Sequence, residues 1–183
     1  ASHYLEHIVR SVAAGKEPME QAKSLLSFLG KALQHNAVYL NKAESIAAME
    51  RFLRDGCEHA DIDEEAVLNL ELGHTRCGFI NGFILAALCR RLGMKNEIFH
   101  PNGGHTSAKL LVDGKWVLAD PDAFKDRHPL AEDGSLPAID MLYEGSNRLL
   151  LDTVPSWEDS NPEEGWLRYR DGFRVTGYLG GGR

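Results

Sequence analysis

Three cysteines, Cys57, Cys77 and Cys89, could act as nucleophiles in this sequence of 183 residues. Three cysteines cannot all pair within one chain, and they are too few for a disulfide framework. Cys77 falls in the first turn of an expected helix, where backbone N–H groups and the helix dipole favour a thiolate. Cys89 lies about three turns further along in an apolar stretch, and Cys57 follows Gly56 at an expected helix end. The sequence therefore favours Cys77 as the nucleophile.

A nucleophilic thiol needs a general base and a group that orients this base. His105 opens one expected strand, and Asp120 closes the next. Because Asp113-Gly114 between the strands is typical of a two-residue hairpin turn, the register places Ser107 opposite Asp120. His105 and Asp120 then become diagonal neighbours on one face of the sheet, provided that no β-bulge shifts the register. This geometry suits a carboxylate that orients the imidazole.

The elements that must position these residues form two groups along the chain. Apolar residues at helical spacing predict helices over 3–12, 18–35, 41–56 and 61–70. A further helix, apolar nearly all round, is expected over 76–92, with Thr75 as its N-cap and Gly93 at its end. Strands are expected over 96–100, 106–112, 115–119 and 173–179. Helices followed by an antiparallel sheet indicate an α+β fold.

Length and composition indicate one domain over residues 1–183. Apolar residues make up 43% and charged residues 26%, which excludes general disorder. A net charge of −7 argues against nucleic-acid or membrane-surface binding, because both need clustered Lys and Arg. No stretch resembles a membrane helix of about 20 residues or a signal peptide, so a cytoplasmic location is expected.

The stretch 73–122 resembles the transglutaminase-like superfamily, whose core is distantly related to papain-like thiol enzymes. It reads GHTRCG, then an apolar helix ending in Leu-Gly-Met, then a short strand, His105 and VDGKWVLADP. The family pattern is a Cys opening a helix that ends in Leu-Gly-aliphatic, a His opening a strand, and Gly-x-Trp-x-x-x-Asp-Pro. The resemblance implies a transglutaminase-like, cysteine-protease-like fold with a catalytic core at about 73–122 and an irregular C-terminal extension at about 123–183. It also implies Cys77 as nucleophile, His105 as general base and acid, and Asp120 as the orienting carboxylate.

The sequence departs from this pattern at several positions. Ser107 stands where family members often have an aromatic residue two after the His, and Glu71 stands where papain-like enzymes place Gln. The backbone N–H of Cys77 can supply one oxyanion donor. The second donor stays open among several side chains: Gln34, Asn36, Tyr39, Asn41 and His74.

The implied chemistry is thiol-dependent acyl transfer or hydrolysis on a peptide, amide or thioester, through a cysteine acyl-enzyme. No cofactor is expected. The acidic stretch 61–65 lacks the Gly of an EF-hand loop, and the paired CxxC zinc motifs common in glycan-removing relatives are absent. The sequence does not decide between an amine and water as acyl acceptor, and it says nothing of oligomeric state.

A zinc site is one alternative for the same residues. Its ligands would come from His74, Cys77, His100 and His105, with Cys57 and His59 as a weaker pair.

A catalytically inactive transglutaminase-like binding module is the second alternative. Its partner surface would be the acidic region after Asp122, which includes Trp157 and Trp166. His128 is a further candidate base, although it follows charged turn residues outside the matched pattern.

Overall fold

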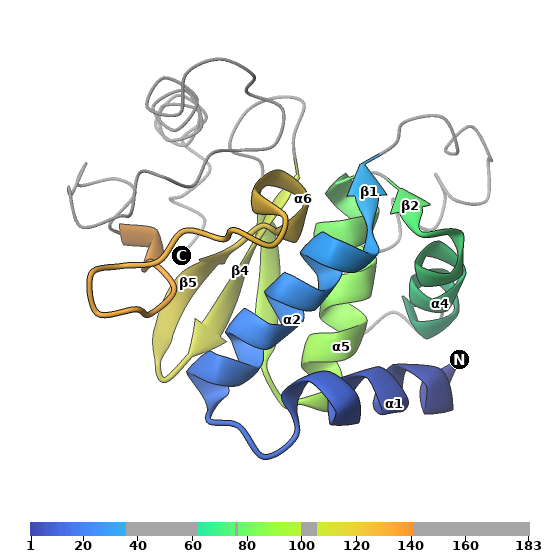
Figure 1. Ribbon diagram of the computed structural model, residues 1–183, viewed down its shortest axis with the longest axis horizontal. Helices are drawn as coiled ribbons and strands as arrows, with labels where there is room; N and C mark the ends of the chain where they lie inside the picture. The colour runs from blue at the N-terminus through green and yellow to red at the C-terminus, as the bar shows by residue number, and fades with distance from the viewer. Residues whose placement is uncertain (36–61, 76, 100–105, 141–183) are drawn as a thin grey trace.

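The computed structural model describes residues 1–35, 62–75, 77–99 and 106–140, and these form an α+β fold (Figure 1). The helices are α1 (Ser2–Ala13), α2 (Pro18–Ala32), α4 (Ile62–Leu72), the π-helix η2 (Gly78–Ile84), α5 (Leu85–Arg91) and α6 (Pro121–Phe124). The strands are β1 (Gln34–His35), β2 (His74–Thr75), β3 (Lys95–Phe99), β4 (Ser107–Val112) and β5 (Lys115–Ala119). The expected α+β class is therefore confirmed. Within these ranges no helix is long and apolar enough to cross a membrane.

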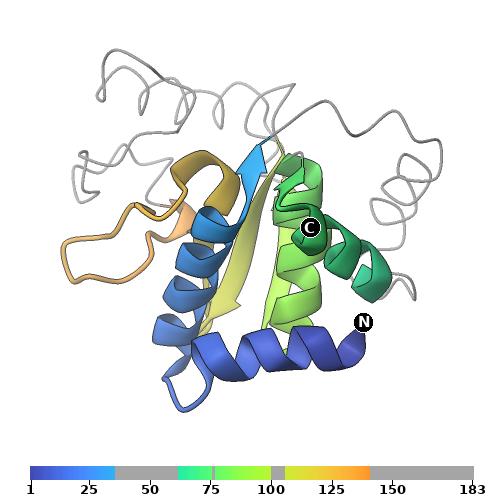
Figure 2. The same cartoon turned by 45° about the vertical axis from the view of Figure 1, so that its right-hand side comes forward.

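The continuous segment formed by η2 and α5 is the centre of the fold. It packs against α1, α2, α4, β3 and β4, and α1 runs across the ends of α2 and α5 (Figure 2). Four of its large apolar side chains, Phe83, Ile84, Leu85 and Leu88, are fully buried. This confirms the expectation of a central helix that is apolar nearly all round.

The winding of this central helix differs from the single α-helix predicted over 76–92. Residues Gly78–Ile84 form a π-helix, and only Leu85–Arg91 continues as an α-helix. All seven residues of the π-helical part are buried, and Gly78 and Gly82 lower its intrinsic α-helix propensity, so packing decides the winding. Gly93 ends the helix with φ of 68°, as predicted.

Thr75 is not the N-cap that the sequence suggested. It lies in β2, and its buried hydroxyl has no hydrogen-bond partner in the described part of the chain. The short parallel pairing of β1 with β2 places Gln34 beside His74 and His35 beside Thr75. Sheet pairing has therefore replaced helix capping at this position.

The second helix ends earlier than the predicted range of 18–35. It stops at Ala32 because Leu33 is extended, with φ of −121°, and is buried. The backbone N–H of Gln34 then donates to the carbonyl of Gly73 at 3.0 Å. This pairing joins two segments that are far apart in the sequence, and the periodicity of the sequence does not show it. It brings the end of α2 close to the segment that precedes Cys77.

The three-stranded antiparallel sheet has the order β3-β4-β5. Ala108 pairs with Ala119 and Val112 with Lys115, without a bulge, which confirms the predicted hairpin register. Asp113 and Gly114 have φ of 49° and 78°, as a two-residue turn of this kind requires. The helix predicted over 41–56 and the strand predicted over 173–179 lie outside the described residues.

Candidate active site

Cys77 lies directly before the π-helix. The π-helix begins at the end of the molecule where β4 begins (Figure 1). Its side chain is 8% exposed, whereas Cys89 in α5 is completely buried. The backbone N–H of Thr106 donates to the Cys77 Sγ at 3.4 Å. The tertiary fold thus places the predicted nucleophile against the residue that follows His105 in the sequence.

Asp120 is completely buried between the end of β5 and the start of α6. Its Oδ1 accepts from the Asn81 amide at 2.7 Å and from the Ala123 backbone N–H at 3.0 Å. Its Oδ2 accepts from the Ser107 hydroxyl at 2.8 Å. These donors hold the carboxylate in one orientation and compensate for its burial.

The structure gives a reason for Ser107 at a position where members of the transglutaminase-like superfamily, which the sequence resembles, often have an aromatic residue. The confirmed register places it opposite Asp120, and its buried hydroxyl bonds the carboxylate there. An aromatic side chain at this position would remove that donor.

Asn81 joins the two halves of the site, and sequence reasoning missed it. Its side-chain amide donates to the Thr106 carbonyl and to Asp120 Oδ1, both at 2.7 Å. One turn earlier on the same helix, Cys77 accepts from Thr106. The available signal was a polar residue four positions after Cys77 in an otherwise apolar helix.

His128 supports Asp120 from the other side. Its Nε2 accepts from the Asp120 backbone N–H at 2.9 Å, and its ring packs edge-on against Phe124 with centroids 5.1 Å apart. Burial lowers the pKa of His128 to about 4, although the charge of Asp120 and the Pro129 carbonyl act in the opposite direction. Because Nε2 already accepts the Asp120 N–H, and because a pKa of about 4 makes the ring a weak base, His128 does not suit the role of general base.

His105 lies outside the described residues, as do three of the candidate oxyanion donors, Asn36, Tyr39 and Asn41. Gln34 is described, and its pairing with His74 brings it into the strand pair that leads to Cys77. Glu71, at the position where papain-like enzymes place Gln, is exposed on α4. Because Gln34 and His74 are partners in the same strand pair, the pairing does not choose between them, and the second oxyanion donor stays a prediction.

Among the described residues no three His, Cys, Asp or Glu side chains are grouped as metal ligands would be. Most ligands of the alternative zinc site, His100 and His105 together with Cys57 and His59, lie outside these residues.

Comparison with known proteins gives one structural likeness. No family model and no curated protein matches the sequence. A crystal structure of a protein from Cytophaga hutchinsonii, provisionally described as a cysteine protease, superposes with a TM-score of 0.44 and 12% identity. The superposition covers 74% of this chain and 40% of that protein, so this chain spans less than half of its length. The α+β class of the chain rests on its own helices and sheet.

Proposed function

We propose that this chain is a thiol enzyme that transfers or hydrolyses acyl groups through a cysteine acyl-enzyme. Cys77 is the nucleophile, His105 the general base and acid, and Asp120 the carboxylate that orients His105. The observation that carries the proposal is the buried cluster that joins Cys77 and Asp120 through Thr106 and Asn81.

The placement of His105 in this proposal follows from its neighbour in the chain. Thr106 has its N–H on Cys77 Sγ and its carbonyl on Asn81, so the start of β4 is anchored at the nucleophile. The confirmed register of β4 and β5 supports the expectation that His105 and Asp120 share one face of the sheet. We therefore expect Cys77, His105 and Asp120 to meet at the same end of the molecule.

In the proposed reaction the Cys77 thiolate attacks the carbonyl carbon of an amide or thioester, and a C–S bond forms. The backbone N–H of Cys77 stabilises the negative charge on the carbonyl oxygen. His105, protonated by the thiol, gives this proton to the leaving amine or thiol as the C–N or C–S bond breaks. Water or an amine then loses a proton to His105 and attacks the thioester, which releases the acyl group and regenerates Cys77.

A generic activated ester tests the nucleophile. With p-nitrophenyl acetate we expect a burst of p-nitrophenolate and one acetyl group added per chain in the intact mass. Cys77→Ala should lose both signals, whereas Cys89→Ala, which removes a fully buried thiol from the same central helix, should keep them. An unacetylated wild-type protein, or an acetylated Cys77→Ala variant, would contradict the proposal.

Two further variants test the orienting groups. His105→Ala should slow acetylation, and Asp120→Asn should slow it by up to about 10⁴-fold, because the amide no longer holds the imidazole in the productive tautomer. Asp113→Asn, in the hairpin turn between them, is the matched control and should acetylate normally. Stoichiometric zinc, with protection of Cys77 that a chelator removes, would instead support the metal site.

A further inference from the structure

We infer that Asn81 is a positioning residue of this site, which holds Asp120 and the start of β4 against the helix that carries Cys77. The inference rests on the proposed function and adds a residue that the Cys-His-Asp pattern does not contain.

The two hydrogens of the Asn81 amide have separate tasks. One bonds Asp120 Oδ1 at the end of β5, and the other bonds the Thr106 carbonyl next to the start of β4. The orientation of the amide is fixed by these partners, since a flipped amide would direct its oxygen at a carboxylate and a carbonyl. Because Thr106 also donates to Cys77 Sγ, one amide connects three segments of the site.

Fold stability alone does not account for an amide at this position. Asn81 is completely buried in a helix whose neighbours on both sides are apolar or Gly. Its Oδ1 is buried without a hydrogen-bond partner among the described residues, which is a cost that an apolar side chain would avoid. The two donated bonds, both to the site, are what the amide supplies in return.

Loss of this amide would act on the reaction through geometry. Asp120 would keep its bonds from Ser107 and Ala123, so the carboxylate would remain hydrogen-bonded. The bonds of the amide to Asp120 and to the Thr106 carbonyl would be lost, and only the Thr106 N–H on Cys77 Sγ would still join the start of β4 to the residue before the central helix. A displacement of about 1 Å at a catalytic group costs on the order of 100-fold in rate.

The test compares Asn81→Ala with Asn69→Ala in the acetylation of Cys77 by p-nitrophenyl acetate. Asn69 is a matched control, because it is also a buried helical Asn, 6% exposed, whose amide donates at 2.8 Å to the carbonyl of Glu65. Both variants should lose stability, measured by urea unfolding. At a temperature where both are fully folded, only Asn81→Ala should acetylate more slowly, by about 10- to 100-fold.

Asn81→Asp supplies a readout that a purely structural role would not move. The new carboxyl would face Asp120, and the two like charges would repel once both are ionised. Relative to wild type, this variant should therefore acetylate best at acid pH and progressively worse as pH rises. The other titratable groups on the elements packed against the central helix include Cys77, His128, Asp122 in α6 and Glu65 in α4, with His105 beside Thr106 in the sequence. All of them are shared with wild type, so the ratio isolates the new carboxyl.

The outcomes separate this inference from the proposed function. If wild-type protein is not acetylated at Cys77, both are wrong. If wild type is acetylated but Asn81→Ala reacts as fast as Asn69→Ala, or the ratio of Asn81→Asp to wild type does not change with pH, only the positioning role is overturned.

Discussion

At the scale of single residues, the site depends on the hydrogen bonds that the buried carboxylate of Asp120 accepts. Asp120 is completely buried and takes its described donors from a helix, a strand and the first turn of α6. Register arithmetic on the sequence predicted that Ser107 would lie opposite Asp120. It did not predict Asn81, because the contact between the helix and the hairpin is not local in the sequence.

His128 gives a prediction for acid stability. Its pKa falls from the usual 6.5 to about 4 in the folded protein, so between these values the unfolded chain binds a proton that the folded protein does not. This contribution to stability is fully present above about pH 6.5 and is lost as pH falls towards 4, by up to about 3 kcal/mol. His128→Gln keeps an acceptor for the Asp120 N–H and removes the titration. Urea unfolding from pH 7 to 4 should show a weaker decline in this variant than in wild type.

His7→Gln is the control for this experiment, because His7 is exposed on α1. Its unfolding free energy should follow the wild-type dependence on pH. An equally steep decline in wild type and His128→Gln would contradict the assigned burial of the His128 ring.

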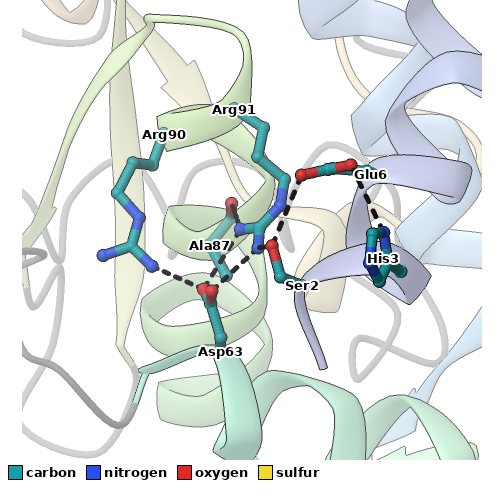
Figure 3. Close-up of polar contacts among 7 residues, drawn as sticks. All are labelled: Ser2, His3, Glu6, Asp63, Ala87, Arg90 and Arg91. Atoms are coloured by element: carbon teal, nitrogen blue, oxygen red, sulfur yellow. Dashed lines mark hydrogen bonds and ion pairs between the residues drawn. The ribbon is translucent and has the colours of Figure 1, made fainter.

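At the scale of elements, an ion cluster fastens α4 to α5 (Figure 3). Asp63 near the start of α4 accepts from both Arg90 and Arg91, with Arg91 bonding its two oxygens at 2.8 and 3.1 Å. The hydrogen bond from Arg91 is the main cause that holds the pKa of Asp63 below its usual 3.8. The central helix has Arg90 and Arg91 at one end and Cys77 at the other. The ion cluster therefore helps to set the position of the helix that carries Cys77.

We expect Asp63→Asn to lower the free energy of unfolding at pH 7 by about 1–3 kcal/mol. The lowered pKa means that this contribution is present above about pH 3.8 and is lost as pH falls further, so the difference from wild type should shrink in acid. Glu64→Gln is the matched control, because it removes a charge from the same first turn at an exposed position. Equal losses in the two variants would indicate a helix-dipole effect in place of the cluster.

The contact of α2 with the segment after α6 requires a glycine. A Cβ on Gly30 would lie 2.0 Å from the carbonyl oxygen of Lys125, which itself has φ of 54°. Gly30→Ala should therefore destabilise the protein by about 1–3 kcal/mol or more, measured by urea unfolding. In an open helix the same change stabilises by about 1 kcal/mol, so a more stable variant would show that the close approach is wrong.

At the scale of the whole molecule, the reactivity of Cys77 reports access to the native site, whereas the reactivity of Cys89 reports global unfolding. Cys89 is completely buried in the central helix, whereas Cys77 retains 8% exposure. Iodoacetamide followed by peptide mapping should label Cys77 in the native protein. Cys89 should react only on global unfolding, at a rate that rises with urea in parallel with the unfolding equilibrium. Concentrated guanidinium chloride is the control in which both react. Labelling of Cys89 at the native rate of Cys77 would contradict the packing of the core.

The sequence by itself determined what local patterns encode. Apolar spacing predicted helices where α1, α2, α4 and the central helix lie, Gly93 predicted the end of the central helix, and Asp113-Gly114 predicted the hairpin whose register the structure confirms. These features depend on the conformations that neighbouring residues in the sequence allow, so they can be predicted from short stretches of sequence.

The tertiary structure alone decided the features that depend on contacts between distant segments. The π-helical winding of Gly78–Ile84, the pairing of Gln34 with His74 and the two bonds of Asn81 all involve such contacts. The first two replace what local propensity favoured, because packing and hydrogen bonding between distant segments outweigh intrinsic helix preferences of about 0–1 kcal/mol per residue. The bonds of Asn81 satisfy buried polar groups of the hairpin. The residues that we propose for the chemistry were predicted from the sequence, whereas the side chain of Asn81 was found only from the contact between the central helix and the hairpin.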